Sequence, residues 1–96
     1  MKTYIIDIDG VLCDDRRGDY KKANPNYINI KKINELYNDG NYIKLFTGRG
    51  SATGIDWAEV TYKQLRSWGV KYHEIIFGKP VGDIFIDDKA LNVKDW

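Results

Sequence analysis

The sequence is poor in cysteine and has no long apolar run. Its one cysteine, Cys13, cannot form a disulfide within the chain, which fits a reducing compartment. No stretch approaches the ~20 consecutive apolar residues that a transmembrane helix needs. The first residues reach the acidic Asp7 too soon for a secretory signal peptide. We therefore expect a cytoplasmic protein that does not associate with membranes.

The sequence also has no excess of charge of either sign. Fifteen Lys and Arg residues oppose fourteen Asp and Glu residues, and the formal net charge is +1, so no overall field attracts nucleic acid. A length of 96 residues predicts one domain, residues 1–96. Three Trp, seven Tyr and three Phe are many for so short a chain. Because Tyr and Trp are favoured at interfaces and a small core needs support, we expect a homo-oligomer.

Short apolar runs alternate with helical patterns along the chain. The expected strands are residues 4–8, residues 42–46, a stretch within residues 72–77, and residues 84–86. The expected helices are residues 27–38, which Asn26 can cap, and residues 56–68, where Asp56 and Glu59 resemble a capping box. This alternation predicts an α/β fold of the Rossmann-like, three-layer type, with a parallel sheet of about four strands.

Chemically active residues follow the expected strands. Asp7 and Asp9 follow the first, Thr47 the second, Lys79 the third, and the pair Asp87-Asp88 the fourth. Parallel strands end at one edge of a sheet, which is where open α/β sheets bind ligands. Four carboxylates, a hydroxyl and an amine at one edge suit a divalent cation and a phosphoryl group.

These four motifs, in this order, resemble those of the haloacid dehalogenase-like superfamily. The first motif of that family is matched by Asp7-Ile8-Asp9-Gly10-Val11-Leu12, and its later motifs by Thr47, Lys79 and Asp87-Asp88. Most members are Mg²⁺-dependent phosphatases, so the resemblance implies that fold and that activity. The chain is also similar to short phosphatases of bacterial capsule-polysaccharide gene clusters. It has no room for the usual cap domain, only a flap-like loop at residues 13–26.

The resemblance implies a role for each matched residue. Asp7 would be the nucleophile that forms an aspartyl-phosphate, and Asp9 the general acid and base. Thr47 would donate its hydroxyl to a phosphoryl oxygen, and Lys79 would neutralise charge. The alternative for Asp7 is a metal-binding or strand-ending carboxylate, for Asp9 a solvated loop residue, and for Lys79 a surface turn.

The resemblance also implies a Mg²⁺ site. Its protein ligands would be Asp7, the backbone carbonyl of Asp9, and Asp87. Asp88 would bind the ion through water or orient Lys79. This ligand set suits Mg²⁺, which prefers a few carboxylates together with water and phosphate oxygens.

The non-reacting part of the substrate has weaker candidates. Gly48 and Arg49 follow Thr47 directly, while Arg16 and Tyr20 lie in the loop that leaves the nucleophile. Ordinary surface exposure is the alternative for the arginines, because most Arg side chains are exposed. The expected ligand is a small phosphorylated metabolite or a sugar phosphate.

Two other functions remain open from the sequence. A receiver-type signalling domain also combines acidic residues, a Thr, a Lys-Pro and Mg²⁺, but its phosphorylated Asp lies on a strand between the acidic pair and the Thr. A non-catalytic phosphate-binding or assembly protein could use the same fold, because fold does not determine function. The order of the motifs favours the phosphatase.

Overall fold

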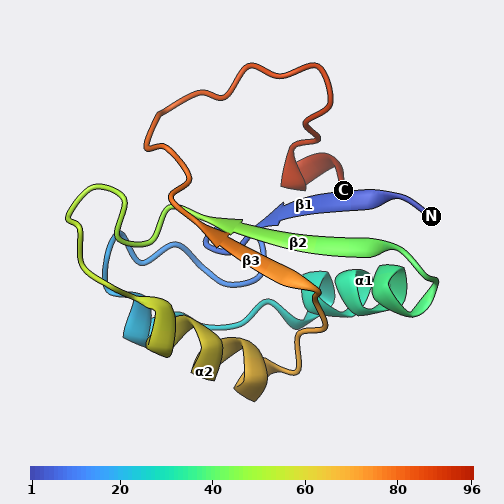
Figure 1. The fold of residues 1–96 in the computed structure, drawn as a ribbon, viewed down its shortest axis with the longest axis horizontal. Helices are drawn as coiled ribbons and strands as arrows, with labels where there is room; N and C mark the ends of the chain where they lie inside the picture. The colour runs from blue at the N-terminus through green and yellow to red at the C-terminus, as the bar shows by residue number, and fades with distance from the viewer.

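The structure is a computed structural model that describes residues 1–96. Three strands and two α-helices alternate along the chain (Figure 1): β1 (Thr3–Asp7), α1 (Tyr27–Asn38), β2 (Tyr42–Thr47), α2 (Ala58–Trp68) and β3 (Glu74–Phe77). Two short 3₁₀ turns occupy Tyr20–Lys22 and Val93–Asp95. No helix is both long and apolar enough to cross a membrane.

The three strands form one parallel sheet in the order β1-β2-β3. Asp7 pairs with Phe46, and Thr47 pairs with Phe77, so all three strands end at the same edge. Both helices lie on one side of this sheet (Figure 1). The expectation of a small α/β fold with a parallel sheet is therefore confirmed.

The core lies between the sheet and the helices. Side chains of β2 alternate between the two faces, and Ile43, Leu45 and Thr47 are fully buried. Nine apolar residues form the core: Ile6, Ile8, Leu12, Cys13, Ile30, Ile33, Ile43, Leu45 and Leu65. Three of them, Ile8, Leu12 and Cys13, lie just beyond β1. The chain that leaves Asp7 is thus anchored in the core before it continues into the loop at residues 13–26.

The bounds of α1 agree with the sequence prediction at both ends. The side chain of Asn26 accepts a hydrogen bond from the Asn29 backbone N–H, as an N-cap does. Gly40 lies just beyond the helix with a φ of 91°, a left-handed conformation that glycine adopts without steric cost.

The start of α2 differs from the prediction. Asp56 accepts a hydrogen bond from the Ala58 N–H, and the helix begins at Ala58 with Trp57 as its N-cap. The predicted capping box does not form, because the helix starts too late for Glu59 to occupy its third position. Gly69 ends the helix at a φ of 71°, as expected.

Residues 84–86, predicted as the fourth strand, lie outside the sheet. The exposed fractions of Ile84 and Ile86 are 81% and 96%, and the outer edge of β1 is unpaired. The segment after β3 runs out past β1 and returns beside it (Figure 1). A strand of three residues can form only a few backbone hydrogen bonds with its neighbour, so its pairing with the distant strand β1 is weak. The structure therefore has three strands and two layers.

Candidate functional site

An ion pair links the ends of the two outer strands, β1 and β3, at one edge of the sheet. Lys79 Nζ lies 3.0 Å from Asp7 Oδ2, although 72 residues separate them in sequence. Asp7 is the last residue of β1, and Lys79 follows β3 after Gly78, which turns the chain at a φ of 96°. The Lys79 N–H donates to the carbonyl of Thr47 at the end of β2. The structure therefore brings Asp7, Thr47 and Lys79 together, as the sequence predicts.

The Asp7 carboxylate is partly buried and remains accessible. Its side chain is 32% exposed, so a ligand can reach it from the sheet edge. Burial raises the pKa of Asp7 above its ordinary value, while the hydrogen bond and the charge of Lys79 oppose that rise. The Ile8 N–H donates to Asp7 Oδ1 and fixes the carboxylate plane. A partly desolvated carboxylate held beside a cation is suited to act as a nucleophile.

Thr47 and Gly48 lie where β2 ends, at the same edge of the sheet. Thr47 is fully buried, and its Oγ1 accepts a hydrogen bond from the Arg49 N–H at 3.1 Å. A Cβ added to Gly48 would lie 3.2 Å from the Lys79 carbonyl oxygen. Glycine at position 48 therefore lets the backbone after β2 pass close to the backbone after β3.

Asp9 and Arg49 form a second ion pair beside the first. Arg49 Nε lies 2.9 Å from Asp9 Oδ2, and Arg49 Nη2 lies 3.0 Å from Asp9 Oδ1. This is the parallel, two-bond geometry that makes Arg–carboxylate pairs strong and orientationally specific. The Arg49 side chain has no exposed surface, and the Asp9 side chain is 15% exposed.

The structure places Arg49, a predicted substrate-binding residue, in a buried position where other side chains occupy its N–H groups. A guanidinium has five N–H groups, and Arg49 directs them to Asp9, Cys13, Thr61 and Gln64. No donor is left for a ligand, and no part of the side chain reaches solvent. Burial by α2 and by the loop at residues 13–26 is a tertiary effect, which the sequence alone does not indicate.

The two loop residues predicted to bind substrate have different surroundings. Tyr20 is half-buried, with its ring 4.8 Å from the Arg49 guanidinium carbon and in edge contact with Trp57. Tyr20 thus covers the ion pair of Asp9 and Arg49. Arg16 pairs with Asp14 at 3.1 Å at the surface, where both side chains are 42% exposed.

The acidic pair lies apart from the rest of the site. Asp87 and Asp88 are exposed, and the Lys89 N–H donates to Asp87 at 2.7 Å, which lowers the pKa of Asp87. No group of three or more His, Cys, Asp or Glu side chains is placed to hold a metal ion. The predicted metal ligands are not brought together here, because the strand that would carry Asp87 to the sheet edge is not formed.

Two polar residues of the site were missed by the sequence reading. Thr61 is fully buried, Gln64 is partly buried, and both accept hydrogen bonds from Arg49 Nη1. The available signal was their spacing, since residues 61, 64 and 65 share one face of a helix with the core residue Leu65. A polar residue on an inward helical face calls for a buried polar partner.

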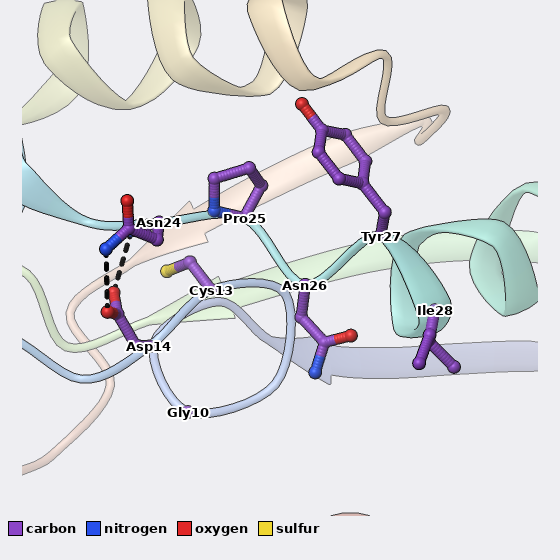
Figure 2. A pocket seen from close by; sticks show the side chains of 8 residues that line it. All are labelled: Gly10, Cys13, Asp14, Asn24, Pro25, Asn26, Tyr27 and Ile28. Carbon is purple, nitrogen blue, oxygen red and sulfur yellow. Dashed lines mark hydrogen bonds between the residues drawn. The ribbon is translucent and has the colours of Figure 1, made fainter.

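A hollow of about 510 Å³ lies between the turn at Gly10 and Cys13 and the segment that leads into α1 (Figure 2). Its lining residues are Gly10, Cys13, Asp14, Asn24, Pro25, Asn26, Tyr27 and Ile28. Asn24 donates to both carboxylate oxygens of Asp14, which ties one end of the loop to the other. Neither Asp7 nor Lys79 lines this hollow, so it is separate from the ion pair at the sheet edge.

Comparison with known proteins gives one structural relative. No family model matches the chain, and no curated protein matches it. A crystal structure of an MCSG target from Vibrio cholerae is similar, with a TM-score of 0.88 and 28% identity. The match covers 98% of this chain and 85% of that chain. The two proteins share a fold, which is a small α/β domain.

We predict that Cys13 is unreactive in the folded protein. Burial, and the nearby Asp9 carboxylate, raise the pKa of the Cys13 thiol to about 12, from a usual value of 9.0. That rise lowers the thiolate fraction at pH 8 by roughly 10³-fold, before steric protection is counted. Iodoacetamide should therefore label native protein far more slowly than protein unfolded in guanidinium. Equal labelling rates in the two states would contradict this placement of Cys13.

Proposed function

We propose that this chain is a phosphatase of the haloacid dehalogenase-like superfamily, and that it hydrolyses a phosphate monoester through an aspartyl-phosphate. The observation that carries the proposal is the contact between Asp7 and Lys79 at the shared end of the sheet. The order of the motifs and the presence of Asp9 two residues after Asp7 support it further, as does the α/β fold.

The proposed reaction has two steps, and each uses these side chains. An Asp7 oxygen attacks phosphorus, the bond from phosphorus to the ester oxygen breaks, and Asp9 gives that oxygen a proton. Water then attacks the phosphorus of the aspartyl-phosphate, Asp9 takes a proton from the water, and Asp7 is released with inorganic phosphate. The Lys79 ammonium offsets the negative charge of the phosphoryl group in both steps.

We propose Mg²⁺ as the cofactor, although the residues that would bind it are not together in this structure. The ion would add positive charge beside the phosphoryl group. Asp7 and the carbonyl of Asp9 are at the sheet edge, but Asp87 is not. We propose that residues 84–86 pair with the free edge of β1 as a fourth strand, which would carry Asp87 to Asp7.

Two observations support this fourth strand. The outer edge of β1 has no partner, and Ile5 on that strand is 63% exposed. Residues 84–86 are an apolar segment that is exposed in this structure, and burying them against β1 would be favourable.

We also propose that the chain forms a homo-oligomer, in which a second copy helps to close the open site.

We expect mutation of the two aspartates to separate their roles. Asp7→Asn should abolish turnover of a phosphate monoester in the presence of Mg²⁺, because the amide is a poor nucleophile. Asp9→Asn should slow turnover by ~10²–10⁴-fold, the range typical of general acid–base groups. Glu59→Gln, which changes an exposed carboxylate on α2, is the matched control and should retain full activity. Full turnover by Asp7→Asn would exclude the mechanism.

Hydrogen exchange tests the fourth strand. With Mg²⁺ and beryllofluoride, a mimic of the bound phosphoryl group, the amides of residues 84–86 should become protected, because pairing with β1 withdraws them from water. Asp87→Asn should weaken that protection. Unchanged exchange at residues 84–86 in a sample that demonstrably binds both additives would count against the strand.

A further inference from the structure

The environment of the Asp9 carboxylate leaves an acceptor position open on Oδ2. A carboxylate has about four lone-pair positions, two on each oxygen. Oδ1 accepts from Arg49 Nη2 and lies 3.4 Å from the Cys13 thiol, whose single proton is shared with the Ile8 carbonyl at 3.7 Å, while Oδ2 accepts from Arg49 Nε alone. Oδ2 is therefore the less occupied of the two oxygens. Any proton that Asp9 exchanges with a ligand passes most directly through this atom.

The Arg49 guanidinium is itself rigidly held. Nη1 donates to Thr61 Oγ1 at 3.0 Å and to Gln64 Oε1 at 2.6 Å, and both acceptors belong to α2. The Arg49 N–H donates to Thr47 Oγ1, which fixes the base of the side chain at the end of β2. A planar fork anchored at both ends can hold its partner carboxylate in only one plane. The orientation of Asp9 is thus set by residues of β2 and α2.

The same contacts extend to the loop at residues 13–26. Gln64 Nε2 donates to the Tyr20 carbonyl at 2.6 Å, while the Tyr20 ring covers the guanidinium. Removing Arg49 would therefore free Asp9 to rotate, yet it would leave Asp7 and Lys79 in contact with each other. The two ion pairs share no side chain.

We propose that Arg49 is the positioning residue for Asp9, and that it aims Oδ2 at the oxygen of the leaving group. This inference rests on the proposed function and deepens it. Arg49 acts only through Asp9, so it matters to the extent that the leaving group needs a proton. An alkoxide departs poorly without one, whereas a dinitrophenolate departs without help.

The experiment compares two substrates, 2,4-dinitrophenyl phosphate and an alkyl phosphate such as propyl phosphate. The quantity measured is kcat/KM, which reports the step that expels the leaving group. Arg49→Met should lower kcat/KM for the alkyl ester at least tenfold more than for the dinitrophenyl ester. Arg49→Lys should show the same bias, because an ammonium retains the charge but lacks the two-bond fork. Arg66→Met, at an exposed arginine of α2, should leave both values unchanged.

Two further variants keep the test decisive. If Arg49→Met does not fold, Gln64→Met removes one of the bonds that hold Arg49 and should show the same bias at smaller size. In an Asp9→Asn background, changing Arg49 should add little further loss for the alkyl ester, because the group it positions is already gone.

The outcomes distinguish this inference from the proposed function. Equal losses for the two esters, or a full further loss in the Asp9→Asn background, would overturn the positioning role while leaving the phosphatase intact. A wild-type protein that hydrolyses neither ester, with Mg²⁺ present, would overturn both.

Discussion

The common direction of the three strands is the constraint on which the rest of the site depends. Because β1, β2 and β3 are parallel, Asp7, Thr47 and the turn at Gly78 all lie at one edge of the sheet. β2 lies in the middle, so its last carbonyl can accept from the Lys79 N–H while the Lys79 side chain crosses to Asp7. An antiparallel strand at any position would send one of these residues to the opposite end.

A buried charge imposes a second constraint. Taking the Arg49 guanidinium out of water is costly, and the structure offsets that cost by giving every N–H an acceptor. Losing one partner of such a pair typically costs roughly 3–5 kcal/mol, since the other charge is then left without compensation. The contacts that compensate the buried charge of Arg49 also hold Asp9, the end of β2 and α2 in one arrangement.

The sequence predicted those elements whose signals are local. Asn26 and Gly40 mark both ends of α1 by their own chemistry, and Gly69 ends α2 for the same reason. The site residues at strand ends could also be predicted, because an apolar run followed by a polar residue is visible in one dimension. The contact of Lys79 with Asp7 then follows from the parallel order.

Features that depend on tertiary pairing could not be predicted. An arginine in a glycine-rich loop gives no sign that a helix and a tyrosine will bury it, so Arg49 was assigned to the substrate. Residues 84–86 have the composition of a strand, but pairing requires the edge of β1, nearly 80 residues earlier. The position of Asp87 depends on that pairing, and so does the fit of a metal ion.

The proposed mechanism requires that Asp7 carries the phosphoryl group. Its most direct test is mass spectrometry of protein that has been mixed with substrate and Mg²⁺ and quenched in acid during turnover. We expect a phosphoryl adduct on the peptide that contains Asp7, and its disappearance when the substrate is consumed. Turnover without an adduct in Asp9→Asn, where hydrolysis of the intermediate should be slow, or an adduct on another residue, would contradict it.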